Sequence, residues 1–92
     1  WVSEENGDVV GFCVREEDNI TGLYLSRRAR GRGVGKHLLD LAKQDRTWIT
    51  VWAYEKHHRA RTFNRREGCD EIAREPCDRT NQIDVEHRWT RS

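Results

Sequence analysis

The sequence predicts an α/β chain of the α+β type, with a mixed, mostly antiparallel sheet crossed by helices in the order β-β-β-α-β-α-β-β. Three observations lead to this fold class. The dipeptide Asn6-Gly7 separates two short apolar runs, which is typical of a β-hairpin. The apolar period becomes helical after Gly33, and strand composition returns at Thr47 and again after Gly68.

The N-terminal part predicts a meander of three strands, over 1–3, 9–15 and 20–26. A type I′ turn at Asn6-Gly7 is expected to join the first two strands, because Asn and Gly accept positive φ. The polar stretch 16–19 is expected to turn the chain into the third strand. Its acidic residues could instead attract a cationic acceptor molecule, and we favour the turn.

Residues 33–45 predict an amphipathic helix. Its apolar residues recur at the spacing of one helical face, which Leu39 widens, and they are Val34, Leu38, Leu41 and Ala42. The segment 47–53 alternates in composition and is expected to form a central strand covered on both faces, with Trp48 and Trp52 on the same face.

The C-terminal part predicts a weaker helix over 57–67, whose apolar side consists of Ala60 and Phe63, with Gly68 as a left-handed C-cap. Strands are expected over 69–74 and 82–89, joined by the turn-rich segment 76–81. One face of the last strand should carry alternate residues, namely Ile83, Val85, His87 and Trp89.

Length and composition limit the core. The 92 residues make at most one domain, and a composition of 35% hydrophobic and 36% charged residues indicates a thin core. The chain begins at Trp1 inside an expected strand and contains no Met, so we interpret residues 1–92 as a single partial domain. No apolar run approaches the roughly 18 residues of a membrane span and no signal-peptide pattern is present, so we expect a soluble, cytoplasmic protein.

The cysteines Cys13, Cys69 and Cys77 show no C-x-x-C spacing. An odd number of cysteines does not fit a disulfide framework, and the lack of C-x-x-C pairs does not fit a zinc site. No metal site is therefore expected. We expect all three to be small hydrophobic residues, with a reactive thiol at one of them as the alternative.

Charge is segregated along the chain although the net charge is only +1. Segments 27–36 and 56–66 each hold five Lys or Arg and no acid. Two separate basic clusters favour a compact polyanion held by two loops, and solvated basic faces are the alternative interpretation.

The first basic cluster contains a glycine-rich loop at the expected start of a helix. The first turn of a helix presents N–H groups without helical partners and a partial positive charge, both of which stabilise phosphate oxygens. Glycines at positions 31, 33 and 35 allow the backbone to approach a bulky pyrophosphate and to adopt positive φ. The loop is therefore a candidate pyrophosphate site.

Two other phosphate loops do not match. A P-loop requires Gly where Arg30 stands and Ser or Thr where His37 stands. A dinucleotide-binding G-x-G-x-x-G pattern would require Gly at Lys36 or at Leu38. Nucleoside triphosphates and nicotinamide or flavin cofactors are therefore not supported.

The loop resembles the motif Gln/Arg-x-x-Gly-x-Gly/Ala of the GNAT (GCN5-related N-acetyltransferase) superfamily, with Arg28, Gly31 and Gly33 at the matching positions. A second family signature is matched in part by His57, Ala60, Phe63 and Asn64, followed by Gly68-Cys69. The resemblance covers essentially the whole chain and lacks the family's first strand and first two helices.

The resemblance implies that acetyl-coenzyme A is the co-substrate and that the protein transfers its acetyl group to a small-molecule or peptide amine by direct attack. It implies that the backbone matching Gly31 to Lys36 holds the pyrophosphate and that the backbone N–H of Leu25 polarises the thioester carbonyl. The cofactor-binding residues expected on this basis are Leu25, Arg30, Gly31, Arg32, Gly33, Val34, Gly35, Lys36 and His57.

Asn64 departs from the family pattern, because many relatives have there a Tyr thought to protonate the departing thiolate. We therefore assign no catalytic acid or base. The alternative functions are an inactive GNAT fold that binds coenzyme A and, less favoured, a nucleic-acid-binding module that uses the Arg-rich loop and the tryptophans. No membrane partner is expected, and self-association is expected from apolar surface that the missing elements would cover.

Overall fold

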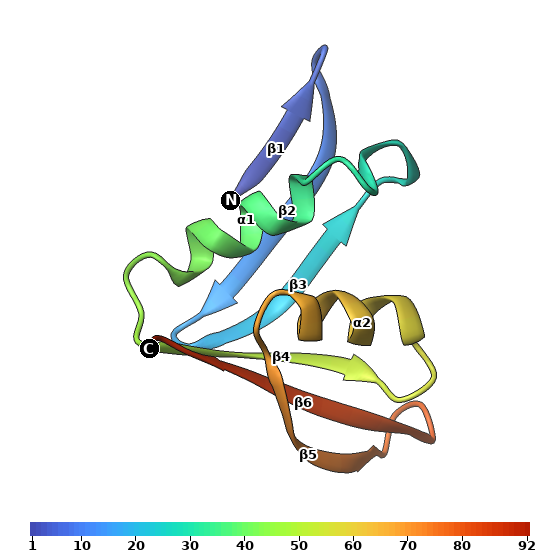
Figure 1. Cartoon of the computed structure of the whole chain (residues 1–92). Coiled ribbons are helices and arrows are strands. Elements are labelled where there is room, and N and C mark those ends of the chain that lie inside the picture. Colours follow the sequence, from blue (N-terminus) through green and yellow to red (C-terminus); the bar gives the residue numbers. More distant parts are fainter. The chain divides into compact units, whose positions relative to one another are not determined.

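The computed structural model describes residues 1–92 and contains six strands, two α-helices and one short 3-10 helix. The chain divides into two compact units, Trp1–Thr47 and Trp48–Ser92, each with three strands and one α-helix (Figure 1). Neither α-helix is long and apolar enough to cross a membrane. The α+β fold class and the order of strands and α-helices expected from the sequence are confirmed.

The first unit is a meander of the strands β1 (Val2–Glu5), β2 (Asp8–Glu16) and β3 (Asn19–Leu25). Both strand pairs are antiparallel, as the sequence predicts. Asn6 and Gly7 have φ of 52° and 83°, which confirms the expected turn with two positive-φ positions.

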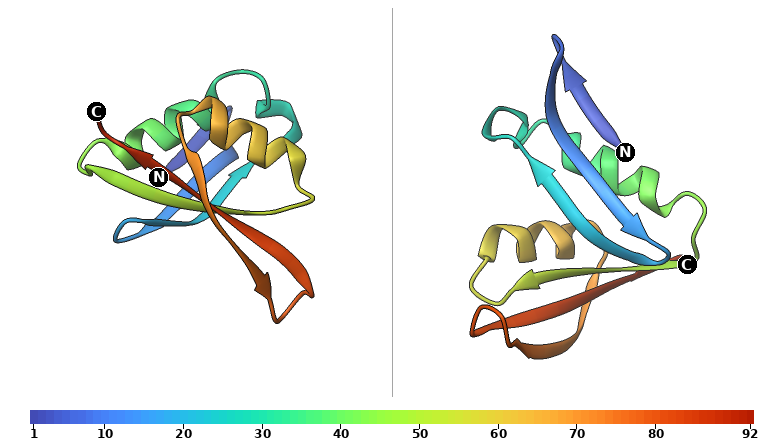
Figure 2. Two further views of the ribbon diagram at one scale, coloured as in Figure 1. Left: turned by 60° about the horizontal axis from the view of Figure 1, so that its bottom comes forward. Right: turned by 180° about the vertical axis from the view of Figure 1, so that it is seen from behind.

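Helix α1 (Val34–Lys43) packs against this meander and contacts all three strands (Figure 1). Leu38, Leu39 and Ala42 are fully buried, whereas Val34 and Leu41 of the predicted apolar stripe are half-buried. The approach is close at Gly11, where a Cβ atom would lie 3.2 Å from Leu38 Cδ1. The right view of Figure 2 shows β2 crossing in front of α1, so that α1 lies on one side of the meander.

Arg15 fastens the end of α1 to β2. Its Nη1 atom donates hydrogen bonds of 2.6 Å to the Ala42 carbonyl and to the Asp45 carboxylate. The hydrogen bond from Arg15 holds the pKa of Asp45 below its ordinary value. The helix position is therefore set by a charged anchor at one end and by close packing at Gly11.

The second unit contains β4 (Trp48–Tyr54), α2 (His58–Arg66), β5 (Asp70–Cys77) and β6 (Gln82–Thr90). Strand β6 pairs antiparallel with both β4 and β5, which gives the order β4-β6-β5. Helix α2 contacts β4 and β5. The core beneath it contains Ile49, Val51 and Val85.

Three details of the second unit differ from the sequence expectation. Strand β5 continues to Cys77, although Pro76 and Cys77 were expected in a turn. Because β5 pairs only with β6, it is an edge strand, and an edge strand tolerates a proline on the side where no neighbouring strand accepts a hydrogen bond from its N–H. The buried residue of α2 is Asn64, with Ala60 and Phe63 only half-buried. Trp48 and Trp52 are likewise half-buried, whereas the sequence predicted a strand covered on both faces.

Candidate functional site

The candidate site begins where β3 ends at Leu25. A 3-10 helix, η1 (Arg27–Ala29), follows and buries Ala29, which holds the loop against the first unit. Gly31 and Gly33 then adopt φ of 76° and 80°. A Cβ atom at either glycine would meet nothing within 4 Å, so the space beside both positions is open. These glycines are therefore required by their conformation, and the room beside them is available to a ligand.

The backbone amides of this loop form the principal chemical feature of the site. The hydrogen bonds of α1 begin with the His37 amide, which donates to the Gly33 carbonyl over 3.0 Å. The amides of Gly31, Gly33, Val34 and Gly35 donate no hydrogen bond within the chain. Gly33 is the N-cap and has no side chain that could occupy these donors. The amides of Gly33, Val34 and Gly35 are thus available to an anion at the positive end of the helix, and the Gly31 amide is available in the loop before it.

The arginines of the loop are of two kinds. Arg28 and Arg32 form ion pairs of 3.6 Å and 2.9 Å with the acids at the tip of the β1–β2 hairpin, Asp8 and Glu5 respectively. Arg27 and Arg30 are exposed and have no carboxylate partner. Fewer arginines are therefore available to pair with a phosphate than the sequence suggests. Within the loop, Arg30 is the arginine without a carboxylate partner.

The hairpin acids Glu5 and Asp8 are functional neighbours that the sequence analysis missed. Asp8 lies 20 positions before Arg28 and Glu5 lies 27 positions before Arg32, and only the antiparallel meander brings the hairpin tip to these arginines. A usable signal is present in the sequence, because acids flank a hairpin turn while the loop holds only cations.

The predicted site residues fall into two places. Leu25 and the residues of the loop lie in the first unit, with Leu25 paired to Gly11 at the end of β3. His57 lies in the second unit at the start of α2, where its side chain is exposed and makes no capping hydrogen bond. The acidic stretch Glu16 to Asp18 forms a tight turn, in which Asp18 pairs with Arg46 at 3.1 Å.

Asn64 is a core residue in this structure. Its side chain is 2% exposed, and its Nδ2 atom lies 3.5 Å from Nδ1 of His87, which is fully buried. Burial lowers the pKa of His87, so the imidazole is held neutral. Asn64, which the family resemblance matches to a tyrosine, is therefore turned toward the interior of the second unit.

The sequence is similar to that of known acetyltransferases. Residues 1–68 match the profile of the Acetyltransferase (GNAT) domain. The chain is 29% identical over 69 residues to the peptidyl-lysine N-acetyltransferase YiaC of Escherichia coli (strain K12), and the match covers 74% of this chain and 47% of that protein. The chain thus spans about half the length of this relative.

Solved structures show the same fold. The solution structure of the apo form of YjaB from Escherichia coli superimposes with a TM-score of 0.85 at 21% identity, covering 97% of this chain and 62% of that chain. A putative streptothricin acetyltransferase from Bacillus anthracis, determined in complex with acetyl coenzyme A, superimposes with a TM-score of 0.86 at 16% identity, covering 99% and 61%. The profile match over most of the chain is decisive, and the chain belongs to the GNAT acetyltransferase family.

Proposed function

We propose that the protein containing this chain transfers an acetyl group from acetyl-coenzyme A to an amine acceptor. The observation that carries the proposal is the set of four amide donors at Gly31, Gly33, Val34 and Gly35, placed at and just before a helix N-terminus with open space beside two of the glycines. A pyrophosphate presents several anionic oxygens close together, which matches clustered N–H donors better than a single carboxylate does.

Each part of the loop has a distinct role in this proposal. The amides bind the pyrophosphate of the cofactor, and the guanidinium of Arg30 adds charge beside them. The backbone N–H at Leu25 polarises the thioester carbonyl, so that the tetrahedral intermediate formed by the attacking amine is stabilised. The protein contributes position and polarisation, and no side chain is assigned as catalytic acid or base. Membership in the GNAT family and the similarity to YiaC, a peptidyl-lysine N-acetyltransferase, support this reaction class.

The sharpest test compares two glycines that share a backbone conformation. Gly33 and Gly7 have φ of 80° and 83°, and neither would place a Cβ within 4 Å of another atom. Gly33→Ala and Gly7→Ala therefore carry a similar backbone strain, of about 1–2 kcal/mol. Only the methyl group at Gly33 enters the space that the pyrophosphate would occupy.

We expect calorimetry to give a dissociation constant for coenzyme A that rises at least about tenfold in Gly33→Ala, equivalent to ~1.4 kcal/mol, and stays near wild type in Gly7→Ala. If both variants weaken coenzyme A binding equally, the weaker binding comes from backbone strain, and the loop is not the coenzyme A site. Release of free thiol from acetyl-coenzyme A in the presence of mixed amines then separates an active transferase from a fold that only binds the cofactor.

A further inference from the structure

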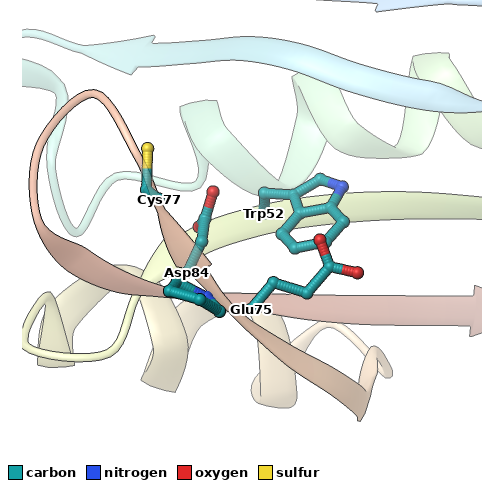
Figure 3. Close-up of a pocket in the computed structure, with 5 residues that line it drawn as sticks. Trp52, Glu75, Cys77 and Asp84 are labelled. Carbon is teal, nitrogen blue, oxygen red and sulfur yellow. The ribbon is translucent and has the colours of Figure 1, made fainter.

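The second unit contains a cavity of about 320 Å³ that none of the preceding features explains. It is lined by Trp52 from β4, by Glu75, Pro76 and Cys77 from β5, and by Asp84 from β6. Figure 3 shows the carboxylate of Glu75 beside the indole of Trp52, and the carboxylate of Asp84 between the indole and the thiol of Cys77. The cavity therefore combines an aromatic surface with two carboxylates.

Strand register places these carboxylates together. Glu75 on β5 lies directly opposite Asp84 on β6, and Trp52 on β4 lies opposite Glu86, the next residue of β6 on the same face. Like charges at directly opposed positions destabilise a sheet, so this pairing carries a cost in the isolated chain. A bound cation would remove that cost.

The acids of the cavity have no cationic partner within the chain. Glu75 and Asp84 form no ion pair, although the chain holds 17 Lys and Arg residues. Two other glutamates of this unit, Glu55 and Glu71, provide a contrast, because both are paired with Arg74. Arginines thus neutralise one group of acids and leave the cavity acids to face solvent.

The thiol of Cys77 adds a third polar group to the cavity. A hydrogen bond from the Thr80 side chain and backbone hydrogen bonds in the same turn lower the pKa of Cys77. Cys77 is half-exposed, whereas Cys13 and Cys69 are buried. This finding supports the alternative that one cysteine is chemically distinct, and it places a reporter group inside the cavity.

We propose that the cavity beside Trp52 binds the alkylammonium group of the acceptor, with the ammonium between Glu75 and Asp84 and the alkyl chain along the indole. This inference rests on the proposed function, because it identifies the acceptor as a cationic amine such as a lysine side chain or a free diamine. Carboxylates accept the N–H bonds of an ammonium, and an indole face attracts a cation within about 6 Å of its centroid.

The test uses Cys77 as the reporter in the intact protein. Alkylation of Cys77 by neutral iodoacetamide is followed by peptide mass mapping, with and without Nα-acetyl-lysine methylamide. A ligand that covers the thiol slows alkylation by the factor one plus its concentration over its dissociation constant, roughly threefold at twice that constant. The uncharged analogue Nα-acetyl-norleucine methylamide has nearly the same shape and should give no protection.

Matched variants locate the effect. Glu75→Gln and Asp84→Asn should each abolish the protection by the lysine compound. Asp78→Asn removes an exposed acid next to Cys77 that does not line the cavity, and it should leave the protection intact. Equal loss in all three variants, or equal protection by the norleucine compound, would overturn the proposal. Stronger protection by 1,4-diaminobutane than by the lysine compound would identify a free diamine as the source of the ammonium.

The two proposals fail separately. Protection of Cys77 requires no acetyl transfer, so it persists if coenzyme A does not bind. Consumption of acetyl-coenzyme A with lysine peptides, without protection of Cys77 and with an unchanged KM for the peptide in Glu75→Gln, would leave the proposed function standing and would eliminate this cavity as the acceptor subsite.

Discussion

Asn64 and His87 form a buried polar pair whose role is structural in this molecule. Replacing Asn64 by Ala removes a buried partner of the imidazole and should lower the free energy of unfolding by about 1–3 kcal/mol. Because the amide faces the interior, kcat measured on folded enzyme should fall far less than the roughly 10²–10⁴-fold typical of a lost general acid. A thousandfold decrease with unchanged coenzyme A affinity would show that the amide orients a reacting group.

Installing the tyrosine that many relatives carry is a different experiment. The side chain of Asn64 is 2% exposed, so a phenol at this position must displace core residues. Asn64→Tyr should therefore destabilise the fold by about 1–3 kcal/mol through overpacking. Thermal unfolding monitored by circular dichroism measures this change. A gain in kcat together with unchanged stability would contradict it, because the new side chain would then point out of the core.

His87 makes stability depend on pH in a defined direction. Burial lowers its pKa, so the folded state resists protonation while the unfolded state takes up a proton below the ordinary value of about 6.5. The contribution is complete above that pH and is lost as the pH falls toward the lowered pKa, at up to about 1.4 kcal/mol per pH unit. Urea unfolding between about pH 5 and 7 should show this decline.

Two variants test whether His87 causes this loss of stability at low pH. His87→Gln should reduce the loss, whereas His58→Gln, at an exposed position, should leave it unchanged. The carboxyl pKa values of Asp45 and Glu71 are lowered by their arginine partners from 3.8 and 4.5, so the stability they confer is lost only in more acidic solution. A loss of stability that survives in His87→Gln would be assigned to another group.

The position of α1 depends on Gly11 of β2. A Cβ there would lie 3.0 Å from the Tyr24 carbonyl and 3.2 Å from Leu38 Cδ1. Gly11→Ala should therefore destabilise the protein by about 1–3 kcal/mol and, by shifting the helix start, weaken coenzyme A binding. Gly22→Ala is the matched control, because its nearest contact is an ordinary 3.6 Å and its effect should be neutral or slightly stabilising. Chemical denaturation of both variants decides the matter.

Local signals explain which elements could be predicted. The β1–β2 turn depends on the neighbours Asn6 and Gly7, and α1 depends on an apolar period within one segment, so both are visible in the sequence. Helix η1 has no such pattern, because its register depends on Ala29 packing into the first unit. The extension of β5 through Pro76 depends on pairing with β6 and was missed for that reason.

The candidate site divides in the same way. Gly31 and Gly33 are predictable, since a glycine pattern before a helix directly indicates positive φ and a close anion. The cavity at Trp52 is not, because it depends on the register that opposes Glu75 to Asp84 across two strands. Periodicity gives the face of a residue, whereas its cross-strand neighbour requires the register.

The first unit has an apolar face that no helix covers. Phe12 stacks on Tyr24 with ring centroids 5.5 Å apart, and Phe12, Val14 and Tyr24 are 37%, 46% and 49% exposed. We expect this chain to self-associate through that face. Sedimentation should show a mass that rises with concentration, and Val14→Lys combined with Tyr24→Lys should shift the protein toward monomer.

Ile72 provides the control for that surface. It is 51% exposed and belongs to the second unit rather than to the apolar face of the first, so Ile72→Lys should leave the association unchanged. If the chain without substitutions is a stable monomer at every concentration, the exposed apolar face of the meander does not drive association, and this prediction is wrong.

The strand order of the second unit also affects how the chain folds during its synthesis on the ribosome. Every strand pair of the first unit joins neighbours in sequence, whereas β4 must wait for β6, which is separated from it by α2 and β5. About 35 residues follow Tyr54 before β6 is complete, an interval of roughly 2–7 s at about 5–20 residues per second. During those seconds the edge of Trp48–Tyr54 that β6 will cover is unpaired, and the growing chain is most open to aggregation there.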